Sequence, residues 1–531
     1  MKYLRNDIKF EPLIWQWYAW PHLINPITAG CNIIERHMKI MQSFIENPQL
    51  HYISSMDPRL IGGPFADLDI SKVNDVKNLV ENTNKNCSEL IQLAQEYKKL
   101  DNFLIDNADG DSLENLYDVV PNILKGCVEL VYDINNNPSI RIIEEILYDK
   151  FYSSKNQSLA VSECKNDKRN FLLSTPRLED DSDQFFINIP FEDERLDQLF
   201  KMKYQGSNID YIANLLEIPP SKKNKFSRIF TYSPPSLSKN RNFSTEGIRI
   251  RYFGHACLLI ETKNISIIFD PVISYSSTSE EEVDRFTYED LPDKIDYVVF
   301  THNHQDHVLI ETLLQIRHKV KNLVVPHSQI GSIIDPSMKL ILKHLGFASI
   351  VEVKEFEDVV DKDIKITSLP FLGEHSDLNI QSKAAYCVSA CNKKILLAAD
   401  SRNLEPRLYD YIFRKIGEVD ILYLGMECEG APLSWLYGPL LTKPLKRSYD
   451  KNRTLSGSDF EKAWYITNKS NCKEAYIYAM GQEPWLNYIM GLNYSKESPQ
   501  IIESDKFINA CLEKGIKSER LFGKKEWLIS N

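Results

Sequence analysis

Short apolar runs dominate the second half of the chain, from Ile248 onward, and polar or turn-forming residues separate them. Runs of this length and spacing are typical of buried β-strands. Several of the intervening stretches carry apolar residues at helical spacing. Strands and helices in this order predict two sheets flanked by helices. The predicted strands are residues 248–253, 256–261, 265–269, 295–300, 323–325, 351–354, 364–369, 384–389, 395–399, 421–425 and 475–479.

The first half of the chain mixes helical and alternating patterns. Ile34, Met38, Met41 and Ile45 fall on one face of a helix that follows Pro26. Taken together, the patterns predict an α+β region. It contains one long helix over residues 73–100, a helix over 113–132 that is broken near Pro121, and strand-like runs between residues 157 and 191, including 171–174 and 184–190.

Residues 7–25 form an aromatic-rich segment with three tryptophans. Aromatic side chains are frequent both in protein cores and at interfaces between chains. We therefore interpret this segment as a hydrophobic plug or a subunit interface, in preference to a wall of a substrate site.

A stretch without periodicity, residues 218–247, separates the two halves of the chain. It contains four prolines and a basic cluster between residues 222 and 228. Such a composition predicts a tether, and we interpret the basic cluster as a solvated face rather than a site for a phosphate group. The predicted organisation is an N-terminal α+β domain over residues 1–217, a linker over 218–247 and a catalytic domain over 248–531.

The composition is that of a globular protein, since 43% of the residues are hydrophobic and 11% are aromatic. A net charge of −11 without a long basic tract argues against nucleic acid as the main partner. The ten cysteines contain no C-x-x-C pair, so we expect reduced thiols. The charged N-terminus and the lack of a long apolar run predict a cytoplasmic protein that does not enter a membrane.

The strongest chemical motif is the sequence T-H-N-H-Q-D-H at residues 301–307, which lies between a predicted buried strand and a helical pattern. His302 and His304 alternate along an extended segment and can point the same way, whereas Asp306 and His307 face a second point. Two pairs of ligands aimed at neighbouring points predict a two-metal site for zinc, iron or manganese. The regular spacing makes a chance cluster of surface histidines the weaker interpretation.

An H-x-H-x-D-H pattern at a strand-to-helix turn resembles the signature of the metallo-β-lactamase superfamily. The resemblance implies an αββα sandwich, with further metal ligands on later loops. Asp400 ends an apolar strand and is interpreted as a bridge between two metals rather than as a turn residue. One of the neighbours Glu374 and His375 is expected to point inward. No histidine follows in the chain, so the acidic loop with Glu427 or Glu429 replaces the late histidine of typical zinc hydrolases.

The candidate ligands thus comprise three imidazoles and four carboxylates. Such an anionic set suits iron or manganese better than zinc. His255, between the first two predicted strands, is interpreted either as a donor to a metal ligand or as a hydrogen-bonded core histidine. The candidate ligands are His302, His304, Asp306, His307, Glu374, Asp400 and Glu427.

The chain also resembles, almost from end to end, the diiron β-hydroxylases of nonribosomal peptide biosynthesis, typified by the chloramphenicol-pathway enzyme. The last two of the shared blocks are the most specific. These blocks are residues 15–21, 62–65, 302–307, 373–375, Asp400, 426–440 and 481–485. The resemblance implies one iron ion on His302, His304 and Glu374, a second on Asp306, His307 and Glu427, and a bridge at Asp400.

The same resemblance implies a reaction, in which a diiron monooxygenase uses O2 to hydroxylate the β-carbon of an aminoacyl group. That group is held as a thioester on a peptidyl carrier protein of antibiotic biosynthesis. It also implies an N-terminal domain that dimerises and helps to receive the carrier. Because the chain has no G-x-G-x-x-G fingerprint, a separate reductase is expected to supply the electrons.

Two other function classes remain as alternatives. A dizinc hydrolase of a thioester, lactone or phosphoester would fit the general fold, but the missing late histidine argues against it. A non-catalytic scaffold is the weakest alternative, because the ligand set is complete. The aromatic residues Trp435, Tyr437 and Trp485 are interpreted as packed core residues rather than as the lining of a substrate channel. The sequence does not identify the amino acid that is hydroxylated.

Overall fold

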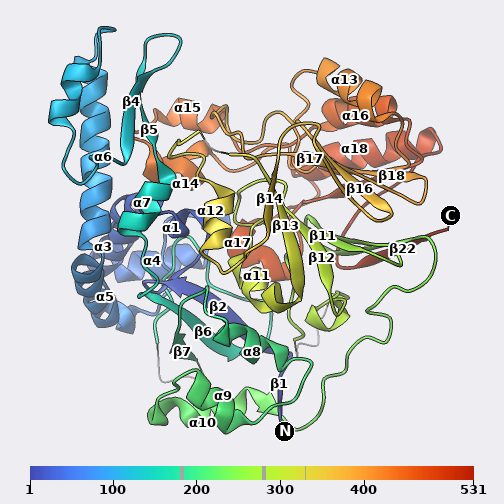
Figure 1. The fold of residues 1–531 in the computed structure, drawn as a ribbon, viewed down its shortest axis with the longest axis horizontal. Helices are drawn as coiled ribbons and strands as arrows, with labels where there is room; N and C mark the ends of the chain where they lie inside the picture. The colour runs from blue at the N-terminus through green and yellow to red at the C-terminus, as the bar shows by residue number, and fades with distance from the viewer. Residues whose placement is uncertain (180–183, 278–282, 329, 531) are drawn as a thin grey trace.

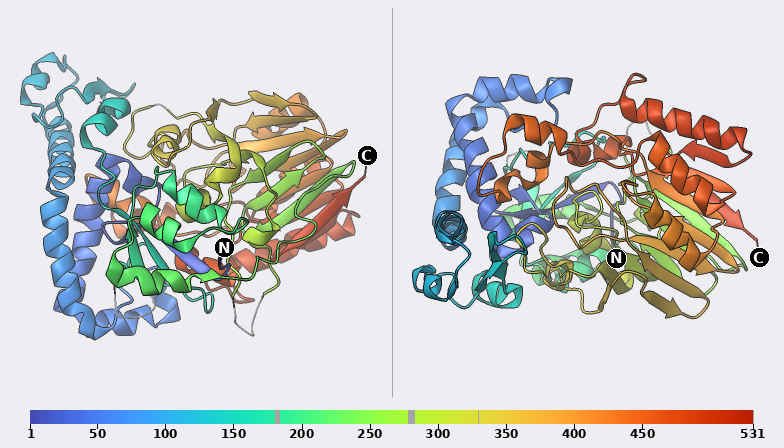
Figure 2. Two further views of the ribbon diagram at one scale, coloured as in Figure 1. Left: turned by 60° about the horizontal axis from the view of Figure 1, so that its bottom comes forward. Right: turned by 90° about the horizontal axis from the view of Figure 1, so that it is seen from above.

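The fold consists of a sandwich of two seven-stranded sheets and a mixed region beside it (Figure 1). The structure is a computed structural model that describes residues 1–179, 184–277, 283–328 and 330–530. The first half of the chain provides the region beside the sandwich, and its long helices stand on the side away from the sheets (Figure 2). The predicted combination of an α+β region and an αββα sandwich is confirmed.

The first sheet of the sandwich is mixed. Parallel pairing joins β11 to β12, β12 to β13 and β13 to β14, and antiparallel pairing joins the remaining strands. In spatial order the strands are β14 (Ile350–Val353), β13 (Val320–Pro326), β12 (Ile295–Val299), β11 (Ser266–Phe269), β10 (Cys257–Glu261), β9 (Ile248–Gly254) and β22 (Lys525–Ile529).

The second sheet repeats this plan. Parallel pairing joins β18 to β19, β19 to β20 and β20 to β21, and the first strands are antiparallel. In spatial order the strands are β15 (Asp358–Asp361), β16 (Ile364–Leu369), β17 (Ala385–Ala390), β18 (Lys393–Leu397), β19 (Ile421–Gly425), β20 (Glu474–Tyr478) and β21 (Lys517–Arg520). The sequence patterns had indicated neither the outer strands β15 and β21 nor β22.

Strand alternation explains why each sheet has two buried faces. Successive side chains of a strand point to opposite sides. In β12, Tyr297 and Val299 belong to the core between the sheets, whereas Val298 packs with α11 (Ile310–Ile316) and the N-terminal region. The outer face of the second sheet is covered by α13 (Arg407–Ile416), α16 (Phe460–Ser470) and α18 (Pro499–Glu513).

The N-terminal region is built around a four-stranded antiparallel sheet. Its spatial order is β3 (Trp17–Tyr18), β2 (Ile8–Ile14), β6 (Gln157–Glu163) and β7 (Phe185–Asn188). Trp17 and Trp20 are buried, and Trp17 stacks on His37 with 3.9 Å between the ring centroids. The helices of this region are α1 (Pro21–Ile24), α2 (Pro26–Asn32), α3 (Met38–Glu46), α4 (Pro48–Ser55), α5 (Val73–Asn86), α6 (Ser88–Asn107), α7 (Glu144–Phe151), α8 (Arg195–Lys201) and α9 (Ile209–Leu215).

Three local predictions for this region are wrong. The long helix breaks at Cys87, whose φ of −113° leaves the helical range, and this break lets α6 pack against α2. Residues 113–132 do not form an α-helix: Glu114–Val119 is a short 3₁₀-helix that ends before Pro121, and Val128–Tyr132 pairs as β4 with β5 (Pro138–Ile142). Residues 171–174 form a turn rather than a strand.

The predicted linker begins with folded structure. It contains α10 (Lys223–Arg228) and β8 (Phe230–Thr231), and β8 pairs with β1 (Tyr3–Leu4) at the start of the chain. The boundaries at residues 217 and 247 stay predictions. All ten cysteines are free thiols, as the sequence predicts. None of the helices in the described ranges has the length and apolar character that a membrane span requires.

Candidate metal centre

The candidate ligands lie on loops that leave the carboxyl ends of strands. The H-x-H-x-D-H motif follows β12, Asp400 follows β18, and Glu427 follows β19. The carboxyl ends of neighbouring parallel strands meet at one edge of a sheet, where loops converge into a crevice. The sandwich therefore brings together residues that lie far apart in the sequence.

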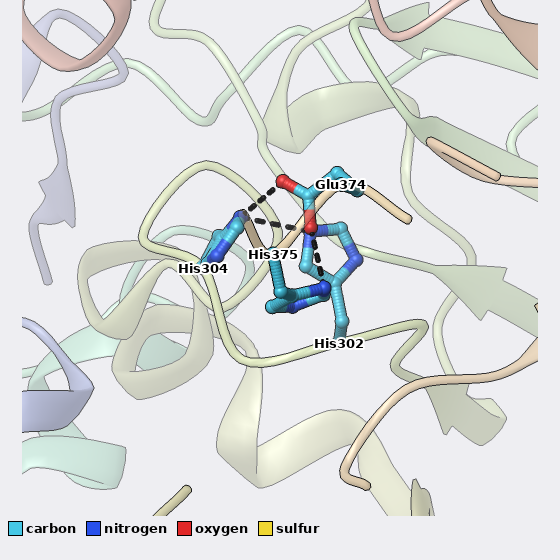
Figure 3. Close-up of side chains that lie close together, drawn as sticks. All are labelled: His302, His304, Glu374 and His375. Carbon is cyan, nitrogen blue, oxygen red and sulfur yellow. Dashed lines mark hydrogen bonds and ion pairs between the residues drawn. The ribbon is translucent and has the colours of Figure 1, made fainter. Parts of the chain in front are cut away.

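The first group of candidate ligands comprises His302, His304, Glu374 and His375, whose ligand atoms lie within 4.8 Å of one another. His304 Nδ1 is 2.7 Å from Glu374 Oε1, and His375 Nδ1 is 2.8 Å from Glu374 Oε2. Figure 3 shows the Glu374 carboxylate pointing toward the three imidazoles. Both members of the Glu374–His375 pair are therefore at the site, but only Glu374 also lines the adjoining cavity.

The second group comprises His255, Asp306 and His307. Asp400 lies between the two groups, since its Oδ2 is 2.9 Å from His307 Nε2 and 3.7 Å from His302 Nε2. From this position one carboxylate can reach ions bound at either group. The arrangement agrees with the predicted bridging role of Asp400, which remains a prediction.

The donor atoms fit metal ions. Three of them are buried and make no hydrogen bond in the part of the chain that the structure describes: His307 Nε2, Glu374 Oε2 and Asp400 Oδ1. Two of these atoms instead face another candidate ligand at ion-pair distance, His307 Nε2 at 2.9 Å from Asp400 Oδ2 and Glu374 Oε2 at 2.8 Å from His375 Nδ1. Buried polar atoms are normally paired, so unpaired atoms that face one another indicate a place for cations. Imidazole nitrogen and carboxylate oxygen together suit non-haem iron.

The pKa shifts of the buried carboxyl groups also indicate a place for cations. Burial alone would raise the pKa of Asp306, but His307 and the hydrogen bond with His255 hold that pKa well below its usual range. Burial, together with the neighbouring carboxylates of Asp400 and Asp306, raises the pKa of Glu427 well above its usual range. Carboxylates crowded in this way repel each other unless a positive charge lies among them.

Glu427 is less closely placed than the other candidates. It lines the cavity beside the metal groups, but it belongs to none of the three clusters whose ligand atoms lie within 4.8 Å in the described ranges. Glu429 lines the same cavity and is exposed, whereas Glu427 is half-buried. Burial therefore favours Glu427, and the assignment stays a prediction.

Two residues support the candidate ligands in a role that the sequence does not indicate. Asp270 Oδ2 lies 2.8 Å from His307 Nδ1, so this carboxylate fixes the orientation of the imidazole. Tyr437 does the same for His304, because its hydroxyl is 3.0 Å from His304 Nε2. Asp270 had a local signal, since it ends an apolar strand as Asp400 does. Tyr437 had none.

His255 was left with two interpretations. Its Nε2 lies 3.0 Å from Asp306 Oδ2, and its ring is buried. The contact favours the interpretation as a partner of the candidate ligand Asp306, which stays a prediction. This contact needs the backbone of His255 in the left-handed region, with a φ of +52°.

A cavity of about 500 Å³ adjoins the metal groups. One of its walls comes from the N-terminal region: residues 59–65, which we call the N-terminal strap. Trp435 lines the cavity too and donates a hydrogen bond of 2.9 Å from its Nε1 to the carbonyl oxygen of Gly62. Trp435 thus contributes to the cavity wall, contrary to the packing interpretation. Tyr437 and Trp485 are buried and lie outside the lining, in agreement with it.

Comparisons with known proteins agree with this architecture. Residues 3–234 match the family model described as the diiron non-haem β-hydroxylase N-terminal domain, and residues 249–381 match that of a β-lactamase superfamily domain. The chain is 35% identical, over 98% of both sequences, to the 4-amino-L-phenylalanyl-[CmlP-peptidyl-carrier-protein] 3-hydroxylase of Streptomyces venezuelae.

Solved structures give the same result. The crystal structure of CmlA, a diiron β-hydroxylase from Streptomyces venezuelae, covers all of this chain and is itself fully covered, with a TM-score of 0.94 and 34% identity. A mutant of the CmlA β-hydroxylase matches with a TM-score of 0.92 and 33% identity over the same extent. The chain therefore belongs to the family of diiron non-haem β-hydroxylases, in which this N-terminal domain precedes a β-lactamase-superfamily domain.

Proposed function

We propose that this enzyme hydroxylates the β-carbon of an aminoacyl group held as a thioester on a peptidyl carrier protein in nonribosomal peptide biosynthesis. The observation that carries the proposal is the similarity, over 98% of both sequences, to a hydroxylase whose name specifies an aminoacyl carrier-protein substrate. The open cavity beside the metal groups offers room for the end of such a substrate.

The proposed ligand assignment takes most of its residues from the two groups in the structure and adds Glu427 from the cavity wall. When bound, two iron ions supply the activation of O2 and the oxidation of a C–H bond. We propose that His302, His304 and Glu374 hold one ion, that Asp306, His307 and Glu427 hold the other, and that Asp400 contacts both.

Other residues of the chain orient these groups and shape the cavity. Asp270 and Tyr437 hold two of the imidazoles through their second ring nitrogens, which fixes the nitrogen that faces the metal. The N-terminal strap and Trp435 form walls around the acyl group and limit the access of water.

Further parts of the proposal concern partners and organisation. The N-terminal domain, residues 1–217, would form a homodimer and help to receive the carrier, and residues 218–247 would link it to the catalytic domain, residues 248–531. A separate reductase would supply two electrons per turnover, and the enzyme would act in the cytoplasm. Membership of a diiron hydroxylase family favours hydroxylation over the alternative of a dizinc hydrolase.

The first experiment measures metal content and oxygen-dependent product together. We expect about two iron ions per chain, as a diiron family requires, and a gain of one oxygen atom in the mass of an aminoacyl-loaded carrier domain after reduction and exposure to air. The same reaction run without O2 is the control. Persistent zinc together with O2-independent release of the acyl group from the carrier would contradict hydroxylation and support a hydrolase.

A further inference from the structure

One polar side chain in the cavity is explained neither by the metal ions nor by the supporting residues. Three described residues that line the cavity carry a buried side-chain oxygen that makes no hydrogen bond: Gln305, Glu374 and Asp400. The oxygen of Glu374 does have an ion-pair contact with His375, at 2.8 Å. Glu374 and Asp400 are candidate metal ligands, so cations would satisfy their oxygens. The amide oxygen of Gln305 has no such explanation.

Gln305 is held in a fixed place. It lies between His304 and Asp306 in the motif loop, and only 4% of it is exposed. The amide hydrogens of His307 and Val308 both bond to the carbonyl oxygen of His304, at 3.1 Å and 2.8 Å, so the loop forms a closed turn around Gln305. Gln305 therefore lies between two candidate ligands of different metal groups in the loop, and all three residues line the cavity.

The chemistry of this amide defines what it can bind. A buried oxygen without a partner is unfavourable in the free protein, and a ligand that donates a hydrogen bond removes that penalty. Apart from the proposed iron ions, the cavity has little positive charge: among its described lining residues Arg59 is the one lysine or arginine, and its guanidinium pairs with Asp57 at 2.6 Å. A cationic donor is therefore the ligand that suits the position.

The proposed substrate carries such a group. In an aminoacyl thioester the α-carbon bears an ammonium group, and the α-carbon is bonded directly to the β-carbon that is hydroxylated. We propose that Gln305 is a substrate-binding residue whose amide oxygen accepts a hydrogen bond from the α-ammonium group. This inference rests on the proposed function, and it explains how the β-carbon would be held beside the metal groups.

The test compares two substrates on three variants and the wild type. One carrier domain carries the aminoacyl group, and the other carries the same acyl group without the α-amine. Q305M keeps the size of the side chain and removes the amide, whereas Q305E keeps an oxygen acceptor. The matched control is N303L, since Asn303 is also a buried amide without a partner in the described structure, lies in the same loop and does not line the cavity.

We expect Q305M to lower kcat/KM for the aminoacyl substrate by about tenfold to a hundredfold, as the loss of a charge-assisted hydrogen bond does. For the substrate without the amine, kcat/KM of Q305M should differ from that of the wild type by less than about threefold, because this substrate cannot form that hydrogen bond. For the aminoacyl substrate, kcat/KM of Q305E should stay closer to the wild-type value than kcat/KM of Q305M. N303L should change kcat/KM for both substrates by the same factor. All variants should keep the iron content of the wild type.

Other outcomes overturn the inference. An equal loss for both substrates in Q305M would show that Gln305 does not act on the amine, and a loss of iron would show that the amide is a metal ligand. In both cases the wild type would still hydroxylate the aminoacyl substrate, so the proposed function would stand. If the wild type hydroxylates neither loaded carrier, the proposed function fails and this inference fails with it.

Discussion

The two halves of the molecule contribute to one site by different means. The sandwich supplies all the candidate metal ligands on loops at the ends of its strands, and the N-terminal region supplies none. The N-terminal region instead supplies the strap that walls the cavity. The comparison teaches that the candidate metal ligands come from one half of the chain, whereas both halves shape the cavity beside them.

A buried cluster of charges joins the two halves. Glu11 on β2 pairs with Arg177 at 3.0 Å and with Arg169 at 2.8 Å, and Arg169 reaches Glu311 on α11 at 2.6 Å. At most 8% of any of these side chains is exposed. Because α11 follows the motif loop, this cluster fixes the N-terminal region to the helix next to the loop of candidate metal ligands.

The largest expected effect is the loss of bound iron and of hydroxylation when a candidate ligand is removed. His304→Ala removes an imidazole that faces Glu374, so we expect less than two bound iron ions per chain. Hydroxylation should fall by more than about a hundredfold, the upper limit seen when a residue that merely supports a ligand is changed. Metal analysis and product mass measure both. The control is His327→Ala, since His327 lies at the end of β13 outside the site; an equal loss in this variant would contradict the assignment of His304.

The second effect concerns the junction between the halves. Glu11→Ala leaves the buried guanidinium of Arg177 without its carboxylate partner, and removal of one member of a buried pair costs about 3 kcal/mol or more. We expect a clearly lower thermal midpoint. Glu129→Ala breaks the exposed pair with Arg141 and should change stability by less than about 1 kcal/mol. Similar midpoints for the two variants would mean that the buried cluster does not join the halves.

The third effect is a pH dependence of stability, which a buried carboxyl group at the junction should cause. Burial raises the pKa of Glu144 from 4.5 to about 7, where its carboxyl meets the side chain of Asn25 and the backbone of Ser337. The folded protein therefore keeps a proton that the unfolded chain releases. The resulting stabilisation is complete below pH 4.5 and is lost as the pH rises through about 7.

Glu144→Gln should flatten this dependence. The stability of the wild type should fall by up to about 3 kcal/mol more than that of the variant between pH 5 and pH 8. Thermal midpoints at several pH values measure the difference. Glu145→Gln, at the exposed neighbouring carboxylate, should retain the wild-type dependence. Parallel curves for the wild type and Glu144→Gln would refute the role of Glu144.

The smallest expected effect lies within the sandwich. Asp270→Asn weakens the hydrogen bond that orients His307, so we expect iron affinity to fall by about tenfold to a hundredfold while the fold is retained. Competition with a chelator measures the affinity. Asp296→Asn is the control, because Asp296 lies at the opposite end of the neighbouring strand and bonds to Ser266. Equal affinities in wild type and Asp270→Asn would contradict this orienting role.

Sequence reasoning succeeded where the signal is local. Most sandwich strands could be predicted because their apolar runs are short and bounded by turns, and the H-x-H-x-D-H motif could be placed because its spacing implies a turn. The patterns did not predict the break at Cys87, which accompanies packing of α6 against α2, or the hairpin at the end of residues 113–132, whose second strand lies beyond the predicted helix. Tyr437 was missed as a partner of His304 because 133 positions separate the two residues.

The sequence by itself determined the types of the candidate ligands, their spacing in the motif loop, and the two-part organisation of the chain. Only the tertiary structure decided which distant loops meet at the strand ends, how Asp270 and Tyr437 orient the imidazoles, and that the N-terminal strap walls the cavity. The physical reason is that residue type and local pattern fix chemistry and secondary structure. Contacts between distant segments depend instead on how whole sheets and helices bury their apolar faces against one another.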